Sequence, residues 1–348
     1  MASFKVRKSS ILGVLLPLFA TVVIIFGLSL TMISSSSMGL ASPMTPLPSW
    51  NDGPTKSAIL EFVDRITQES SPDFVPVEDR IATFDNDGTL WAEQPLIQGA
   101  FVLNQLQQKA VDDPTLLQQP LIKALSAGDT AYLEQVEMSD VDQLLALLNQ
   151  GVTDEAFQQD VENFFRTATH PTLKVLYSEL TFKPMVELMA YLRANGFQTW
   201  ICSGGGIDFI RVISEQFYGV PQQQVIGSSL KKQFVEESDQ MILKRTGELN
   251  SFNDKAVKPV NINLHIGKRP VFAAGNVKSG GDIAMLTYSQ ERSGPSFQLI
   301  VNHDDTEREF AYGEPDNASL DAAKTKNWQV ANIKRDWKTV FAYQEKSQ

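Results

Sequence analysis

The chain has 348 residues, of which 43% are hydrophobic and 20% are charged, and its formal net charge at pH 7 is −11. A chain of this size can form one large domain or a core with an inserted subdomain. The acidic excess argues against a nucleic-acid-binding protein, because phosphate backbones require clustered Lys and Arg. The single cysteine, Cys202, excludes an intrachain disulfide.

The first fifty residues differ in composition from the rest of the chain. Lys5, Arg7 and Lys8 precede an apolar run of 22 residues from Ile11 to Met32, and the first acidic residue is Asp52. A basic segment followed by an uncharged apolar stretch is typical of an export signal. The run is long for a cleaved signal and close to the roughly 20 residues that span a bilayer, so a cleaved signal and a retained anchor both remain open.

We predict that residues 1–41 are this signal peptide or membrane anchor and that residues 42–55, rich in Pro and Ser, form a linker. Small residues at Gly39-Leu40-Ala41 would permit cleavage. Basic flanks stay on the cytoplasmic side of a membrane. The sequence therefore predicts an exported protein, either periplasmic or extracellular, or anchored to the membrane by its N-terminal helix.

The next elements are a helix and a strand, followed by a long helical stretch. Apolar spacing predicts a helix over Lys56–Glu69, and the apolar segment Arg80–Phe84 predicts a short strand. From Trp91 to about Glu179 no strand pattern occurs. The spacing there predicts four helices, near 97–109, 115–126, 139–150 and 153–169, with Asp140 and Thr153 as candidate caps. We interpret residues 91–179 as an α-helical insertion.

The pattern then turns to strands that alternate with helices. The predicted elements are helix Pro184–Asn195, strand Gln198–Cys202, helix Ile207–Phe217, strand Gln224–Gly227, a polar hairpin over 231–250, and strands Pro270–Ala274 and Phe297–Val301. Such alternation implies a parallel sheet with helices on both faces, whose ligands bind at the carboxyl ends of the strands. The predicted fold class is α/β, a doubly wound parallel sheet formed by residues 56–90 and 180–348.

Two carboxylates stand at the end of the first predicted strand. The strand runs directly into Asp85-Asn86-Asp87-Gly88-Thr89. Two acids spaced two residues apart at a buried strand end repel one another unless a cation neutralises them. The first aspartate can attack phosphorus, and the second can protonate the leaving oxygen. The alternative is a solvated turn after a strand, without a chemical role.

The segment Phe84-Asp85-Asn86-Asp87-Gly88-Thr89-Leu90 resembles the first motif of the haloacid dehalogenase (HAD) superfamily. The resemblance implies a Rossmann-like core, with Asp85 as the nucleophile and Asp87 as the acid and base. Dehalogenase members lack the second aspartate, so Asp87 implies a phosphatase or a phosphomutase. The resemblance extends to about Phe341, and Asn302–Glu309 is similar to a branch akin to phosphoserine phosphatases.

A second motif follows the strand that ends at Cys202. The sequence Ser203-Gly204-Gly205-Gly206 resembles the second HAD motif, which implies that Ser203 and Gly204 bind a phosphate oxygen. Backbone N–H groups and the start of the next helix would also favour an anion. A serine hydrolase of the G-x-S-x-G type would need glycine where Ile201 stands. We interpret Cys202 as a packing residue rather than a nucleophile, and a plain strand-to-helix turn remains the structural alternative.

The third and fourth motifs are a lysine and an acidic loop. Lys258 is the better match to the phosphate-binding lysine, and Lys255 is the alternative. The loop from Gly275 to Asp282 resembles the fourth motif, which implies a magnesium site formed by Asp85, Asp87 and Asp282. The sequence departs from the motif in two ways: Asn276 stands where the first acid is often found, and the loop is about two residues longer. Magnesium accepts one or two carboxylates with waters.

The helical insertion lies where subclass I members carry a cap domain over the active site. A cap excludes bulk water and supplies side chains that select the substrate. Trp91, Glu93 and Arg211 are candidates for contacting the leaving group, each with packing or surface exposure as the alternative. His303 and Asp304 are candidates for the rim of the pocket, with helix capping as the alternative.

These features predict a Mg²⁺-dependent phosphomonoesterase that forms an aspartyl-phosphate on a small phosphorylated metabolite. One alternative is a weak or inactive HAD-like protein that binds phosphorylated ligands. A phosphomutase is a further alternative. The predicted partner is a small phosphorylated substrate, with a membrane possible through the N-terminal segment, and with neither a nucleic acid nor a protein partner.

Overall fold

The computed structural model describes residues 46–127, 129, 132, 135–278 and 280–347, which fall within one compact unit. The predicted signal peptide or anchor, residues 1–41, lies outside the described residues, as does the start of the predicted linker. Across the described ranges, no helix is both long and apolar enough to span a membrane.

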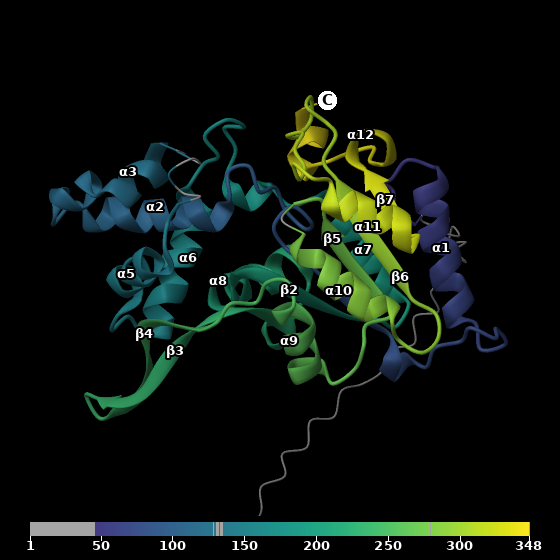
Figure 1. The fold of residues 1–348 in the computed structure, drawn as a ribbon, viewed down its shortest axis with the longest axis horizontal. Coiled ribbons are helices and arrows are strands. Elements are labelled where there is room, and N and C mark those ends of the chain that lie inside the picture. Colours follow the sequence, from purple (N-terminus) through teal and green to yellow (C-terminus); the bar gives the residue numbers. More distant parts are fainter. Residues whose placement is uncertain (1–45, 128, 130–131, 133–134, 279, 348) are drawn as a thin grey trace, which may run out of the picture. The chain divides into compact units, whose positions relative to one another are not determined.

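A seven-stranded sheet forms the centre of the unit (Figure 1). Its strands are β1 (Ile81–Phe84), β2 (Gln198–Gly206), β3 (Val225–Glu237), β4 (Gln240–Ser251), β5 (Phe272–Asn276), β6 (Phe297–Asn302) and β7 (Gln329–Asn332). Their spatial order is β4-β3-β2-β1-β5-β6-β7, and β3–β4 is the antiparallel pair while the other neighbours are parallel. The predicted doubly wound sheet is confirmed. The strand order reverses at β1, where open α/β sheets bind their ligands.

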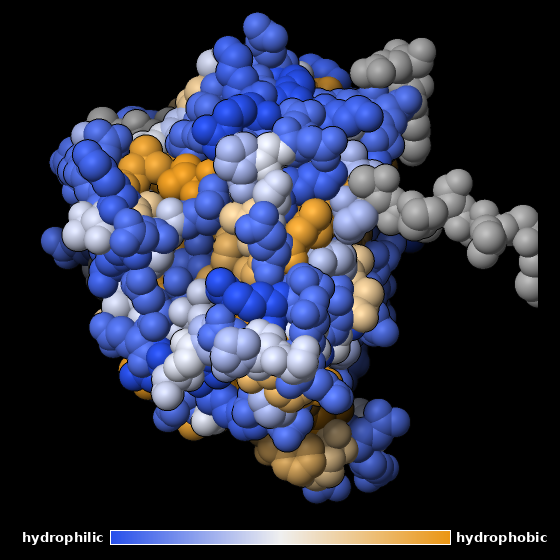
Figure 2. All heavy atoms as spheres, turned by 90° about the vertical axis from the view of Figure 1, so that its right-hand side faces the viewer, coloured by the Kyte–Doolittle hydropathy of each residue, from blue (hydrophilic) through white to orange (hydrophobic). Residues whose placement is uncertain are grey.

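Helices connect the strands. The α-helices are α1 (Pro54–Thr67), α2 (Ile97–Lys109), α3 (Pro120–Ala127), α5 (Met138–Asn149), α6 (Asp154–Thr167), α7 (Lys183–Ala194), α8 (Ile207–Tyr218), α9 (Val257–Ile266), α10 (Gly281–Gln290), α11 (Ala318–Lys326) and α12 (Ile333–Asp336). Short 3₁₀ turns lie at Val77–Asp79, Pro114–Gln118, Tyr177–Glu179, Gln222–Gln224 and Ala342–Ser347. The face that carries α1 is mostly hydrophilic, with scattered hydrophobic patches (Figure 2).

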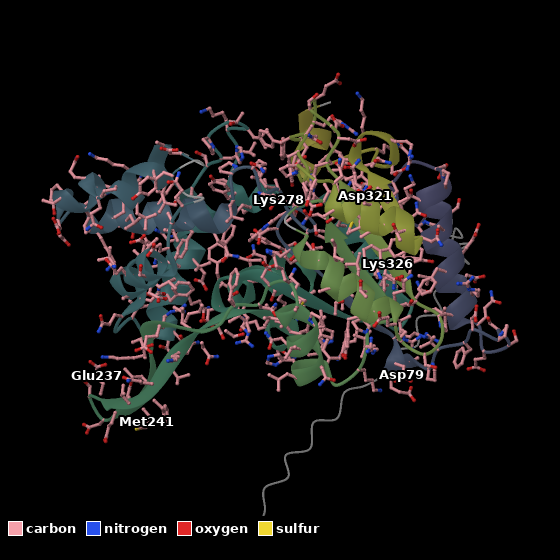
Figure 3. All side chains as sticks on the ribbon, in the orientation of Figure 1. Asp79, Glu237, Met241, Lys278, Asp321 and Lys326 are labelled. Atoms are coloured by element: carbon pink, nitrogen blue, oxygen red, sulfur yellow. The ribbon has the colours of Figure 1, made fainter. Side chains whose placement is uncertain are left out.

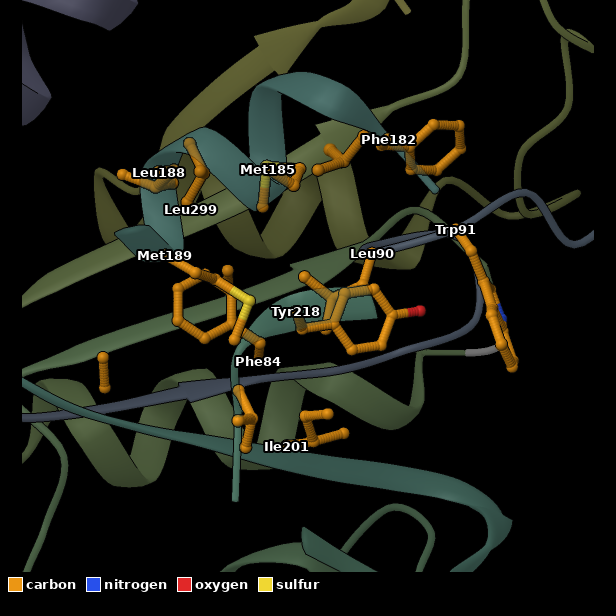
Figure 4. Packing of buried hydrophobic residues seen from close by; sticks show 14 of the residues in the cluster. Phe84, Leu90, Trp91, Phe182, Met185, Leu188, Met189, Ile201, Tyr218 and Leu299 are labelled. Atoms are coloured by element: carbon orange, nitrogen blue, oxygen red, sulfur yellow. The ribbon is translucent and has the colours of Figure 1, made fainter. Parts of the chain in front are cut away.

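The core lies on both faces of the sheet. Every residue of β1 is buried, as expected for a parallel strand covered on two sides. Phe84 packs with Leu90, Met185 and Leu188 in the larger hydrophobic cluster (Figure 4), whereas Ile81 belongs to a second cluster. This double burial fixes the strand that carries the first motif.

The predicted helical insertion contains α2, α3, α5 and α6, and the described residues of 91–179 include no strand of the sheet. Thr153 caps α6, because its hydroxyl accepts a hydrogen bond from the N–H of Ala156 at 3.1 Å. The prediction for Asp140 is wrong by three residues. Glu137 is the N-cap of α5, and Asp140 is the reciprocal partner of a capping box.

The predicted strand Gln224–Gly227 and the hairpin over 231–250 are not separate elements. They form the continuous strand β3 and its partner β4. The reason is Gly227, where a Cβ would lie 2.8 Å from the carbonyl oxygen of Gly205 and 2.9 Å from the backbone of Ile207. Glycine here marks a close approach to β2 rather than the end of a strand.

The described part of the predicted linker packs against the core. Trp50 is 2% exposed, its indole N–H donates to the carbonyl of Pro184 at 2.9 Å, and its ring meets Trp337 edge to face. The sequence pattern did not predict β7, a four-residue edge strand with polar residues at both ends and no apolar alternation. Both errors come from long-range contacts that a local pattern does not contain.

Candidate active site

The motif residues meet at the carboxyl ends of β1, β2 and β5. Asp85 directly follows β1, and its backbone N–H donates to the carbonyl of Ala274 in β5 at 2.9 Å. The chain then turns at Gly88, whose φ of +70° lies in the left-handed region. A Cβ at this position would lie 2.6 Å from the carboxylate of Glu93 and 3.0 Å from Asn276. Both the backbone angle and the space therefore require glycine.

Lys258 joins two aspartates from different strand ends. Its Nζ lies 2.6 Å from Oδ1 of Asp85 and 2.5 Å from Oδ1 of Asp282, and the three side chains are at most 8% exposed. Burial by itself would lower the pKa of Lys258, but Asp282 and Asp85 outweigh it and raise that pKa. Lys255, the alternative, is exposed. Lys258 is the second residue of α9.

Burial dominates the acidity of the two aspartates of the first motif. It raises the pKa of Asp85 well above its usual range, Asp282 raises it further, and Lys258 opposes the shift. Burial also raises the pKa of Asp87, against hydrogen bonds from Trp91 and Ser203. The indole N–H of Trp91 donates to Oδ1 of Asp87 at 2.9 Å. Asp87 is thus held in place and favours its protonated form.

Ser203 lies at the tip of β2 beside Asp87. Its hydroxyl is 3.4 Å from Oδ2 of Asp87 and accepts the N–H of Gly205 at 3.0 Å. Asn253, which the sequence analysis missed, donates its amide to the carbonyl of Ser203 at 2.9 Å. Burial raises the pKa of the Cys202 thiol to about 12, which supports the interpretation of this residue as packing.

Asn276 faces the oxygens of the first motif. Its Nδ2 donates to the carbonyl of Asp87 at 2.8 Å and lies 3.3 Å from Oδ2 of Asp85. Its Oδ1 accepts the N–H of Lys278 at 2.8 Å. Asn276 therefore already places a positively polarised group next to the carboxylate and the carbonyl.

A magnesium ion fits this set of oxygens. Within the described residues, no group of three or more His, Cys, Asp or Glu side chains is arranged to hold a metal. Oδ2 of Asp85 and the carbonyl of Asp87 nevertheless converge on one donor, the amide of Asn276. Hard oxygen ligands suit Mg²⁺, which also retains waters. Asp282 is engaged by Lys258 and by the N–H of Asn276 at 3.1 Å, so its predicted role as a ligand stays a prediction.

A cavity of about 320 Å³ opens onto these groups. The residues that line it include Asp85, Asp87, Gly204, Lys258 and Asp282. The structure thus brings together all but one of the predicted site residues at a single cavity. The exception is Ser203, which is fully buried directly beneath Asp87.

Three further side chains line the same cavity. Lys278, two residues after β5 (Figure 3), lies 3.4 Å from the carboxylate of Glu93. Burial raises the pKa of Glu93, and Lys278 opposes that shift. The prediction that Glu93 faces the leaving group is therefore compatible with its position. Gln98, for which no motif gave a signal, also lines the cavity.

The other candidates lie outside the cavity. Trp91 is fully buried and orients Asp87, and the guanidinium of Arg211 donates to the carbonyl of Gln222 at 3.1 Å. His303 is buried behind the first motif, with Nε2 2.7 Å from the carbonyl of Gly88. Asp304 is exposed and accepts the N–H of Lys334 at 2.9 Å, a capping contact at the start of α12. These side chains position the site or stabilise the fold.

The chain matches a known family by its sequence and solved structures by its fold. The model of the haloacid dehalogenase-like hydrolase family matches residues 82–286. No curated protein matches the sequence. A functionally unknown protein from Anaerococcus prevotii superposes with a TM-score of 0.50 and 15% identity, covering 79% of this chain and 90% of that chain. A protein of unknown function from Bordetella pertussis superposes with a TM-score of 0.48 and 16% identity, covering 73% of this chain and 98% of that chain.

A probable phosphoserine phosphatase from Vibrio cholerae gives a TM-score of 0.41 and 12% identity, over 78% of this chain and 64% of that chain. At these identities, similarity between structures concerns the fold alone. The family match rests on the sequence, and it spans all four motifs, from the residue after Ile81 to Leu286.

Proposed function

This chain belongs to the haloacid dehalogenase-like hydrolase family, and we propose that it is a magnesium-dependent phosphomonoesterase acting on a small phosphorylated metabolite. The observation that supports this reaction most is the contact of Lys258 with both Asp85 and Asp282. It gathers a nucleophile, a cation and a further acid at one cavity, where Asp87 stands as a second titratable group.

In the first step, a carboxylate oxygen of Asp85 attacks phosphorus and the bond to the leaving oxygen breaks. Asp87 donates its proton to that oxygen. Its raised pKa favours the protonated state that this donation requires. Lys258 contacts Asp85, opposes the burial that raises its pKa, and orients its carboxylate. The products of the step are the free alcohol and an aspartyl-phosphate on Asp85.

In the second step, the ionised Asp87 removes a proton from water, which attacks phosphorus and releases phosphate from Asp85. The backbone of Gly204 and the ammonium of Lys258, which both line the cavity, would hold the phosphoryl oxygens. Magnesium, held by Asp85, the carbonyl of Asp87 and either Asn276 or Asp282, would neutralise the charge of the phosphoryl group.

The test is phosphate release by the purified full-length chain from a panel of small phosphomonoesters, with Mg²⁺ and with a chelator. We expect release with Mg²⁺ and loss with the chelator. An absence of release from every ester would contradict the proposal.

A second candidate follows from Asn276, whose amide occupies a position facing the motif oxygens without adding a negative charge. A protein with a weakened metal site would bind phosphorylated ligands and not turn them over. Its signature is thermal stabilisation by phosphate esters in the absence of phosphate release.

We also propose that the protein is exported, on the basis of the basic and apolar N-terminal segment. Fractionation of expressing cells tests this directly. The full-length chain should appear in the membrane or the exported fraction, and replacing the apolar residues 11–32 by a polar sequence should retain it in the cytoplasm.

A further inference from the structure

A second cavity adjoins the phosphate-binding one. It has a volume of about 380 Å³, and Gln98 and Phe252 line both cavities. The second cavity lies between the helical insertion and the β3–β4 hairpin, with walls from α2, α5, α8 and the two strands. A molecule whose phosphoryl group lies at Asp85 would therefore extend from the first cavity into the second.

Apolar side chains that the protein core does not use line this cavity. Val141 and Leu145 come from α5, Leu230 from β3 and Leu249 from β4. None of the four belongs to a hydrophobic cluster of the described chain. They are half-buried, so an apolar ligand would remove surface from water that the fold leaves accessible.

The charged groups of the cavity wall are already paired. Arg245 lies 3.0 Å from Asp208, donates to Asn149 at 3.0 Å, and stacks 3.7 Å from the ring centre of Phe157. Lys232 contacts Asp208 at 3.0 Å and Asp154 at 2.6 Å, so two cations face two carboxylates. These partners leave no excess charge in the wall, so the cavity does not favour a second anion.

The junction of the two cavities combines exposed apolar groups with one polar donor. Phe252 is 58% exposed and Leu96, at the rim of the first cavity, is 45% exposed. The amide oxygen of Gln98 accepts the N–H of Gly206 at 2.8 Å. Its Nε2 is buried without a hydrogen-bond partner among the residues that the structure describes. This N–H group is therefore free to donate a hydrogen bond to an oxygen of a ligand.

We infer that the substrate is a phosphomonoester of an apolar alcohol, whose hydrocarbon chain fills the cavity between α5 and the hairpin. This inference rests on the proposed phosphatase function and names its substrate class. At about 30 Å³ for a group the size of a water molecule, the cavity accommodates a chain of roughly ten carbons. Gln98 and Phe252 contact the ester end of the chain, where it leaves the phosphate-binding cavity.

The first experiment is a chain-length series on the full-length protein with Mg²⁺. We expect kcat/KM to rise about fourfold per methylene from butyl to octyl phosphate and to level off near ten carbons, as burial of successive methylenes requires. Comparing kcat/KM for geranyl phosphate and decyl phosphate tells whether the alcohol is an isoprenoid or a straight-chain alkyl alcohol. Equal kcat/KM for methyl and octyl phosphate would overturn the inference.

The second experiment uses a matched pair of leucines in β4. Leu249 lines the cavity, whereas Leu243 is 41% exposed and pairs with Phe234 towards the tip of the hairpin. The tip, marked by Glu237 and Met241, lies away from Lys278 (Figure 3). Leu249→Gln should lower kcat/KM for octyl phosphate at least tenfold and leave methyl phosphate within twofold, and Leu243→Gln should change neither.

Leu145→Trp is the second variant, in case Leu249→Gln does not fold. It fills the same cavity from the opposite wall and should shorten the preferred chain by several carbons. A Leu145→Trp protein that folds and keeps the wild-type preference would overturn the inference.

Failure of the inference is distinguishable from failure of the proposed function. Binding of alkyl phosphonates, measured by calorimetry, requires no hydrolysis. If no ester is hydrolysed but affinity rises with chain length, the phosphatase function is refuted and the apolar site is retained. If esters are hydrolysed without any chain-length effect, the phosphatase is retained and the apolar site is refuted.

Discussion

Two regions of the molecule are built in different ways: the edge formed by the carboxyl ends of the strands, which carries the motifs, and the helical insertion. At the edge, each functional group follows a short buried strand, as Asp85 follows β1 and Asn276 ends β5, so its position depends on few backbone torsions. The apolar cavity instead depends on how α5 packs against β4. In the proposed function, the strand ends carry out the reaction and the insertion selects the alcohol that is released.

The largest expected effect is at the nucleophile. Asp85→Asn should lower the rate for every phosphomonoester by roughly 10⁴-fold or more, because no carboxylate remains to attack phosphorus. Phosphate release measures it, and a thermal melt checks the fold. The control is Asp79→Asn, a surface acid paired with Lys268 at 2.6 Å (Figure 3), which should leave activity unchanged. If Asp85→Asn kept its activity, Asp85 would not be the nucleophile.

The second effect is on stability and its pH dependence. Lys258→Met leaves Asp85 and Asp282 buried without their cation, which costs about 3–5 kcal/mol at neutral pH. Since burial already raises the pKa of Asp85, loss of the cation raises it further. A carboxyl with a raised folded-state pKa stabilises the fold when protonated, and that contribution is lost as pH rises through the pKa.

The difference in melting temperature between wild type and Lys258→Met should therefore shrink as the pH falls from neutral towards about 4, the ordinary pKa of an aspartate. Lys255→Met serves as the control, because Lys255 is exposed, and it should affect neither stability nor turnover. A pH-independent difference would mean that Lys258 stabilises the fold by packing alone.

A third, smaller effect concerns the metal. Asn276→Asp restores the acid that the motif usually carries and removes the amide donated to Asp85 and to the carbonyl of Asp87. Without metal, the added charge next to Asp85 should lower the melting temperature. With Mg²⁺ the variant should regain stability, and the metal concentration for half-maximal stabilisation should fall roughly tenfold. An identical response to Mg²⁺ in both proteins would place the metal elsewhere.

The same contrast explains how much the sequence could predict. Asp85, Asp87, Ser203, Lys258 and Asp282 could be predicted to lie close together because each belongs to a short motif, and strand ends of a parallel sheet converge. The doubly wound sheet followed from the alternation of strands and helices. The place of Lys258, chosen over Lys255, agrees with its burial between two carboxylates.

Residues that act through tertiary contacts had no such signal. Asn253 supports the carbonyl of Ser203 from the end of the hairpin, and Gln98 reaches the site from α2. Neither stands in a motif, and an amide in a loop or helix is usually solvated. For Arg211 the sequence signal was misleading. Arg211 follows a motif closely in sequence, but its guanidinium contacts the carbonyl of Gln222 and does not line the cavity.

A fourth prediction concerns the pH profile of the edge. Trp91→Phe removes the hydrogen bond that lowers the pKa of Asp87. Because Asp87 must be protonated to act as the acid, kcat/KM falls as the pH rises through its pKa, and in the variant this fall should move to higher pH. Trp328→Phe, another buried indole whose N–H donates to Gln290, should leave the profile unchanged. A shift to lower pH would contradict the role of Asp87 as the acid.

The smallest effect is expected where β4 packs against the insertion, at Gly247. Its φ is +79°, and a Cβ there would lie 2.6 Å from Cα of Ala146 in α5. Gly247→Ala should therefore push α5 away from β4 and cost about 1–2 kcal/mol of stability. Because that displacement alters the apolar cavity and leaves the strand ends in place, turnover of octyl phosphate should fall several-fold while that of methyl phosphate holds. An equal loss on both esters would mean that the two regions are mechanically coupled, and that the insertion also orients the catalytic groups.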